Sequence, residues 1–190
     1  WLGRAYGRKA EHSIFFKAIG WARKCRAEFE RAVQLNAANV PARTDLAEYY
    51  LEAPSFLGGG KDKARMQADE IASRDKPASH MVKARVAEDE KDYETAEREM
   101  WAAISDSDQS AGYWLDLAAF YRRRDRLDDM ENATNKAVAA DKQKDPAILV
   151  QAAALLLRAG RNFPGAALLS GSLVGKKSVA VAPSRAIPAP

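Results

Sequence analysis

Apolar positions recur along most of this chain with the period of an amphipathic α-helix. Within residues 111–144 they follow an i, i+3, i+4, i+7 spacing and resume after the polar stretch RRRDR, which predicts two helices joined by a short turn. The first helix carries this pattern at Trp114, Leu117, Ala118 and Tyr121. Residues 77–110 align with this segment without a gap, and both are 34 residues long. The chain is therefore predicted to repeat a helix pair.

The same helix-pair pattern extends in both directions from these two segments. We expect an all-α, right-handed superhelical solenoid of about five antiparallel helix pairs, because a single pair exposes too much apolar surface to be stable alone. The expected repeats are residues 1–40, 41–76, 77–110, 111–144 and 145–174, and a loose tail rich in Ala and Pro follows at 175–190. Two connections are longer than this plan needs: an irregular one in the first repeat, which holds His12, and a turn at 52–64.

Several segments resemble the tetratricopeptide repeat family. The stretch WLGRAYG carries the Leu-Gly-x-x-Tyr pattern of a first helix, CRAEFERAVQLNA carries the Phe and second Ala of a second helix, and YWLDLAAFY matches a first helix again. The proline that usually ends such a repeat is replaced by Ala37, Lys76, Asp108 and Lys142. The expanded turn is similar to that of bacterial members of general function. The resemblance implies a protein-binding superhelix whose first helices line a concave groove.

Composition limits the classes of function. The 190 residues hold 30 Lys and Arg against 26 Asp and Glu, interleaved along the chain, so the net charge of +4 is a weak argument for nucleic acid. A single cysteine excludes an internal disulfide, and no apolar run is long enough to span a bilayer. The chain opens without Met inside a helical pattern, which predicts a fragment of a longer soluble protein, cytoplasmic or periplasmic.

The stretch EAPSFLGGGKDKA raises the question of a phosphate-binding loop. A Walker-type loop needs Gly where Ser55 stands and a hydroxyl where Asp62 stands, and it follows a strand rather than a helix. We therefore favour a structural turn. Pro54 is expected to end one helix and Asp62 to cap the next, while Phe56 and Leu57 pack the turn against the stack.

Other reactive residues also have structural interpretations. Cys25 stands at a small-residue position of a second helix, where we expect it to fill a helix contact. His80 occupies the place of Trp114 and is expected to be partly buried, and His12 to be solvated. The cluster at 121–126, YRRRDR, contains Asp125 and is followed by Asp128 and Asp129, and it is interpreted as a turn with local ion pairs.

The sequence therefore predicts a non-enzymatic scaffold that binds an unidentified protein or peptide, with no cofactor, no metal and no catalytic residue. Carrying the family's groove positions onto this chain selects Arg4, Arg8, Asp45, Glu48, Glu52, Met81, Arg85, Asp89, Leu115, Arg122, Arg123, Gln151 and Arg158. Two alternatives stay open: a nucleotide-binding or enzymatic protein using the loop at 58–61, and a nucleic-acid binder using the arginines at 122–126. Nucleic acid and a membrane span are not expected. Self-association through uncapped ends of the array is an additional expectation.

Overall fold

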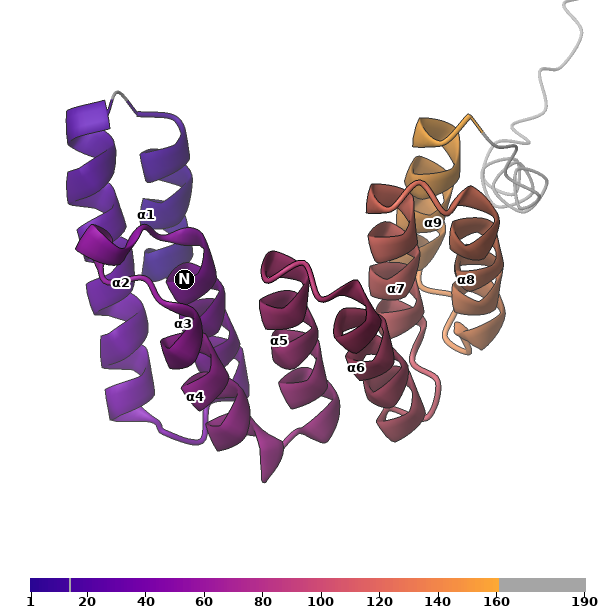
Figure 1. The fold of residues 1–190 in the computed structure, drawn as a ribbon, viewed down its shortest axis with the longest axis horizontal. Coiled ribbons are helices and arrows are strands. Elements are labelled where there is room, and N and C mark those ends of the chain that lie inside the picture. Colours follow the sequence, from indigo (N-terminus) through magenta and orange to yellow (C-terminus); the bar gives the residue numbers. More distant parts are fainter. Residues whose placement is uncertain (14, 161–190) are drawn as a thin grey trace, which may run out of the picture.

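The computed structural model describes residues 1–13 and 15–160, and in these ranges it contains α-helices and a short 3-10 turn but no strand (Figure 1). The helices are α1 (Leu2–Glu11), α2 (Phe15–Leu35), α3 (Val40–Glu52), α4 (Lys61–Ala72), α5 (Lys76–Asp89), α6 (Tyr93–Asp106), α7 (Ala111–Arg123), α8 (Leu127–Ala140) and α9 (Pro146–Arg158), with the 3-10 turn η1 at Ser55–Leu57. The predicted all-α class is confirmed. The second helix expected in the fifth pair, and the tail, lie outside the described residues.

The helix starts are encoded locally by a recurring cap. Asn39, Asp75 and Asp145 precede α3, α5 and α9, and each side chain accepts a hydrogen bond from a backbone N–H in the first turn. A proline stands at the beginning of each of these helices, where its missing N–H costs nothing. The chain therefore re-enters a helix at a defined residue each time it begins a new pair.

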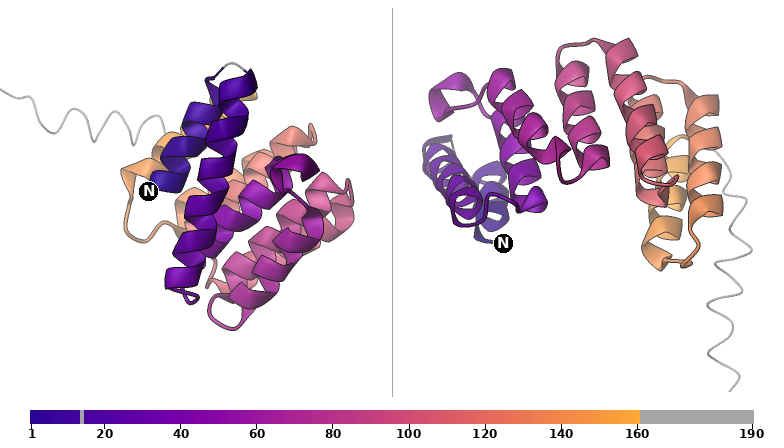
Figure 2. Two further views of the ribbon diagram at one scale, coloured as in Figure 1. Left: turned by 90° about the vertical axis from the view of Figure 1, so that its left-hand side faces the viewer. Right: turned by 90° about the horizontal axis from the view of Figure 1, so that it is seen from below.

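Consecutive helices pack as pairs, α1 with α2, α3 with α4, α5 with α6 and α7 with α8, and each pair contacts the next. The turns inside two pairs have matching geometry, because Lys91 and Asp125 both adopt a left-handed backbone conformation. In the right-hand view of Figure 2 the stacked pairs bend into an arch, with α1 and α2 near one foot and α8 and α9 near the other.

Two hydrophobic clusters run through the array and meet at α5. The first joins α2, α3, α4 and one face of α5, where Val82 and Val86 are buried. The second joins the other face of α5, at Ala84 and Ala87, to α6, α7, α8 and α9. Because α5 is buried on two sides, it links the N-terminal and C-terminal parts of the array.

Two local predictions were wrong. The expected irregular connection in the first repeat is short, because α2 begins at Phe15 and the additional residues lengthen this helix instead. His12 is nevertheless exposed, directly after α1. Asp62 does not cap α4: the cap position is Gly60, and Asp62 lies in the first turn, where its carboxylate pairs with Arg65.

Candidate functional site

The first helices of the pairs line a series of hollows on one face of the array. Residues of α3, α5 and α7 surround a hollow of about 270 Å³, and the C-terminal ends of the same helices surround another of about 550 Å³. A larger cleft of about 880 Å³ lies between α1 and α3. Glu48, on α3, lines all three, so this side chain stands at the centre of the face.

The cleft has an apolar floor and charged walls. Its floor is formed mainly by Cys25 and Phe29 of α2, together with Tyr49 and Leu57. Its walls are the faces of α1 and α3, which present Arg4, Arg8, Glu11, Asp45, Glu48 and Glu52. A concave site with an apolar base and a few polar groups at its edge is the usual form of a binding pocket.

Ion pairs cross the hollows from one helix to the next. Arg4 of α1 makes a two-pronged contact with Asp45 of α3, with nitrogen–oxygen distances of 2.7 and 2.8 Å. Arg85 of α5 lies 3.7 Å from Glu48 of α3. Arg123 of α7 pairs with Glu88 of α5 at 2.7 and 2.8 Å. These contacts connect the first helices of neighbouring pairs along the face.

Two carboxylates on this face have raised pKa values, because nearby positive charge does not offset the effect of burial. Burial raises the pKa of Glu48, and the nearby carboxylates Asp45 and Glu52 raise it further, although Arg85 opposes them. Burial also raises the pKa of Asp116, on α7, against the opposing effect of Arg85 and Arg123. The ionised form of both groups would be stabilised by a cation that entered the hollows.

Most of the predicted groove residues line these hollows. Those that do are Arg4, Arg8, Asp45, Glu48, Glu52, Met81, Arg85, Asp89 and Arg123. Leu115 does not: it is 5% exposed and belongs to the C-terminal core. Gln151 and Arg158 are exposed on α9 outside these hollows, and Arg122 is half-buried with its Nε atom unpaired. That these residues bind a ligand remains a prediction.

The sequence reasoning missed several lining residues, among them four that border the same hollow. Thr44 and Leu51 of α3, and Tyr113 and Asp116 of α7, all border the hollow between α3, α5 and α7. Thr44 and Leu51 lie one helical turn to either side of Ala47 and Glu48, so the helical period of α3 contains their signal. Tyr113 and Asp116 lie close to Leu115 in the sequence, and they border the hollow in which Leu115 was expected.

The glycine loop is closed by its own hydrogen bonds. The N–H groups of Gly58, Gly59 and Gly60 donate to the carbonyls of Ser55, Pro54 and Tyr50 at 2.8, 3.2 and 2.8 Å. Gly58 has a φ of 91°, and a Cβ atom at Gly59 would lie 1.7 Å from the carbonyl oxygen of Ala53. The glycines are therefore required by the turn, and these N–H groups are not available to a phosphate.

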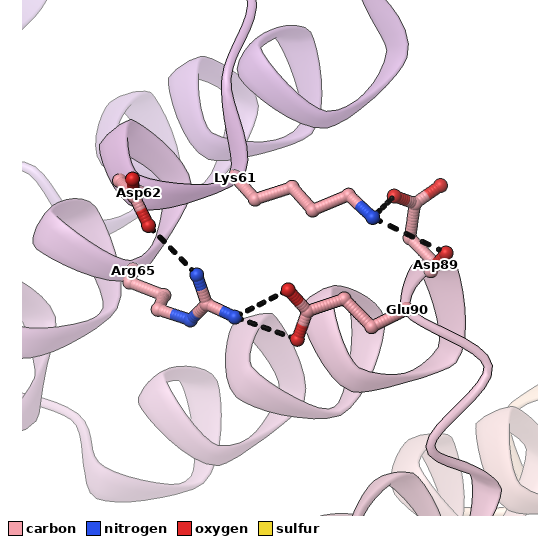
Figure 3. A network of polar contacts seen from close by, with 5 residues as sticks. All are labelled: Lys61, Asp62, Arg65, Asp89 and Glu90. Carbon is pink, nitrogen blue, oxygen red and sulfur yellow. Dashed lines mark hydrogen bonds and ion pairs between the residues drawn. The ribbon is translucent and has the colours of Figure 1, made fainter.

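The lysine after the glycines also has a structural partner. Lys61 Nζ lies 2.8 Å from a carboxylate oxygen of Asp89 at the end of α5, and Arg65 pairs with the neighbouring Glu90 (Figure 3). These contacts attach the start of α4 to the end of α5. Leu57 is buried, as predicted, whereas Phe56 is 64% exposed, so only one of the two apolar side chains packs the loop.

Arg123, Arg124 and Arg126 take part in local contacts, as predicted for the cluster at 121–126. Arg126 pairs with Glu97 and Asp129, and Arg123 pairs with Glu88. The guanidinium of Arg124 lies 3.5 Å from the ring centroid of Tyr93, a cation–π distance. Because these contacts neutralise or shield the side chains, the cluster is poorly suited to phosphate binding.

The remaining reactive residues were placed correctly. Cys25 is buried, and burial raises the pKa of its thiol to about 11, so the nucleophilic thiolate is disfavoured. His80 is half-buried and its Nδ1 lies 2.7 Å from Glu99 Oε2, a partner that the sequence did not indicate.

In the described ranges no cluster of three or more His, Cys, Asp or Glu side chains is arranged to hold a metal ion. None of the helices described combines the length and apolar character that crossing a bilayer requires.

No protein-family profile and no curated protein sequence matches this chain. Two crystal structures of MamA are similar to it at 13% identity. One covers 74% of this chain and 80% of the MamA chain with a TM-score of 0.44, and the other covers 96% and 98% with a TM-score of 0.46. Because both TM-scores are below 0.5, these similarities do not show the family of the chain.

Proposed function

We propose that this protein is a non-enzymatic scaffold that binds a segment of a partner protein along the face formed by α1, α3, α5 and α7. The observation that carries the proposal is the continuity of the hollows, which meet at Glu48 and extend over the first helices of four helix pairs. An elongated, shared lining of this kind fits a chain segment better than a compact substrate.

The charged side chains on the face are suited to selecting how a bound segment is aligned. Acidic and basic side chains alternate within the ion pairs that connect α1, α3, α5 and α7, and these pairs are partly exposed, so a partner's charges can exchange with them at low cost. Such alternation selects the register of a bound segment more than it adds affinity. The closed glycine loop and the engaged arginines give the two alternative functions no comparable support.

Site-specific cross-linking tests the proposal. A photo-reactive amino acid would replace Glu52 at the edge of the cleft or, as the matched control, Met66, which is 64% exposed on α4 and outside the hollows. After irradiation in cell extract, we expect discrete adducts from position 52 and none of them from position 66. Identical adducts at both positions, or none from position 52, would contradict the proposal.

A further inference from the structure

The cleft between α1 and α3 carries an excess of negative charge. Five carboxylates line it, those of Glu11, Asp45, Glu48, Glu52 and Asp75, against two arginines, Arg4 and Arg8. The contact between Arg4 and Asp45 uses one charge of each sign. Four carboxylates then remain in the lining against Arg8, and one of them, Glu48, has an Arg85 nitrogen of α5 at 3.7 Å, so the cleft keeps an excess of negative charge although the chain as a whole has a net charge of +4.

We propose that this cleft binds an extended segment of the partner in which a lysine or arginine stands next to a large aliphatic or aromatic residue. The inference rests on the proposed function and specifies its ligand. The apolar side chain would enter the cleft and lie on Cys25 and Phe29, and the cationic group would reach Glu48 and Glu52.

The spacing of the acidic wall fits this segment. Glu48 and Glu52 stand four residues apart on α3, so they lie on the same side of the helix about 6 Å apart along its axis. Alternate side chains of an extended strand are separated by about 6.6 Å and point to the same side. Two basic residues separated by one apolar residue would therefore match both carboxylates.

The cleft ends at an ion pair, and its volume limits what it can hold. The pair formed by Arg4 and Asp45 crosses from α1 to α3 and lines both the cleft and a second hollow of about 520 Å³ beside it. It therefore divides the two spaces. A volume of about 880 Å³ accommodates several residues of a peptide, whereas a single side chain would leave most of it empty.

A negatively charged ligand does not fit this arrangement. A phosphate or an acidic peptide would have Arg8 as its partner in the cleft but would face Glu11, Glu48 and Glu52. The pKa of Glu48 is already raised by burial and by its neighbouring carboxylates, so another negative charge would raise it further.

The test uses a fluorescein-labelled peptide containing Lys-Leu-Lys-Leu between Gly-Ser flanks, with Glu-Leu-Glu-Leu and Lys-Ser-Lys-Ser peptides as controls. Fluorescence anisotropy is expected to show saturable binding of the first peptide alone. The Glu48→Gln variant should weaken this binding roughly tenfold and Glu52→Gln about threefold, because the second carboxylate is more exposed. Glu94→Gln, on the exposed surface of α6, is the matched control and should have no effect.

The single cysteine reports where the peptide binds. Cys25 lies on the floor of the cleft, but it is buried and its pKa is raised to about 11, so its alkylation by iodoacetamide is followed at alkaline pH by mass spectrometry over a long time course; the bound peptide should slow it further. A thermal denaturation series with and without peptide separates this protection from general stabilisation. Binding that left alkylation unchanged and tolerated both Glu→Gln variants would overturn the cleft inference while leaving the proposed function standing. Absence of binding by all three peptides would overturn the inference too, and the cross-linking experiment would then decide the function independently.

Discussion

The inner face of this array, formed by the first helices of the pairs, has an open cleft at its N-terminal end and closely packed helices at its C-terminal end. Between α1 and α3 there is a cleft, and the direct contacts of α1 with α3 centre on the pair of Arg4 and Asp45. Between α7 and α9 the helices pack directly, and Leu115, Ala152 and Leu156 are buried together. Equivalent places in the helix-pair plan thus form a site in one region and a core in the other.

The side chains of the terminal helices explain this difference. The face of α1 that lines the cleft carries Arg4, Gly7, Arg8 and Glu11, which are charged or small. The face of α9 that packs on the core carries Ile148, Ala152, Leu155 and Leu156. Charged side chains resist burial whereas aliphatic ones favour it, so α1 leaves an open cleft against α3 and α9 packs closely against α7. The comparison predicts different responses to equivalent substitutions.

The largest expected difference concerns two phenylalanines. Phe120 is 1% exposed in the C-terminal core, and Phe120→Ala should lower the free energy of unfolding by about 3–5 kcal/mol. Phe29 is buried but borders the cleft, where water can replace the lost ring, so Phe29→Ala should cost about half as much. Urea denaturation followed by circular dichroism measures both. Equal losses would show that the cleft floor is as tightly packed as the core.

Two glycines make the next comparison, at the loop and at the cleft. Gly59→Ala should cost more than about 2 kcal/mol, because the new Cβ atom would overlap the carbonyl oxygen of Ala53. At Gly7, inside α1, a Cβ atom would lie 3.6 Å from Cys25 Sγ, an ordinary contact. Gly7→Ala should therefore stabilise the protein by about 0.5–1 kcal/mol through helix propensity. Thermal denaturation of both variants provides the measurement, and destabilisation by Gly7→Ala would show that α1 lies closer to α2 than described.

The sequence predicted the helices better than the connections between them. Periodicity located the pairs from α3 to α8, because their apolar residues recur with the helical period and because α3 and α5 begin with a capping side chain. It failed at the first connection, since the fixed repeat length made residues 15–24 look like an insertion. Their own apolar spacing, including Trp21, Ala22 and Cys25, already indicated that α2 begins earlier.

The prediction of groove residues was also limited by its reliance on the repeat. Met81 and Leu115 occupy equivalent repeat positions, and a repeat rule assigns both to the groove. Only the structure shows that α9 contributes to the core that buries Leu115, whereas Met81 remains at a hollow. Which inner positions stay open depends on the next helix along the array, and that information lies in tertiary packing rather than in the repeat.

Cys25 gives the cleft floor a pH dependence of its own. Its folded pKa is about 11 against a reference value of 9.0, so the unfolded chain loses the thiol proton first as the pH rises. The associated stability is present below pH 9 and is lost between about pH 9 and 11, by up to about 2 kcal/mol. Urea denaturation of wild type and Cys25→Ala across this range isolates the effect as a difference. Parallel pH profiles would contradict the burial of the thiol.

The smallest expected effect separates binding from stability on the inner face. Since the pKa of Glu48 is raised in the folded state, its ionised form opposes folding near neutral pH, and this cost disappears below the unfolded pKa. The side chain is 45% exposed, so Glu48→Gln should stabilise the protein by only a few tenths of a kcal/mol at pH 7 and by nothing at pH 3. Glu94→Gln, which lies away from the hollows, should leave stability unchanged at both pH values. If Glu48→Gln instead destabilised the fold at pH 7, the carboxylate would be a structural partner of Arg85. If it stabilised the fold while weakening the Lys-Leu peptide, the array would keep a carboxylate that costs stability because a cationic partner needs it.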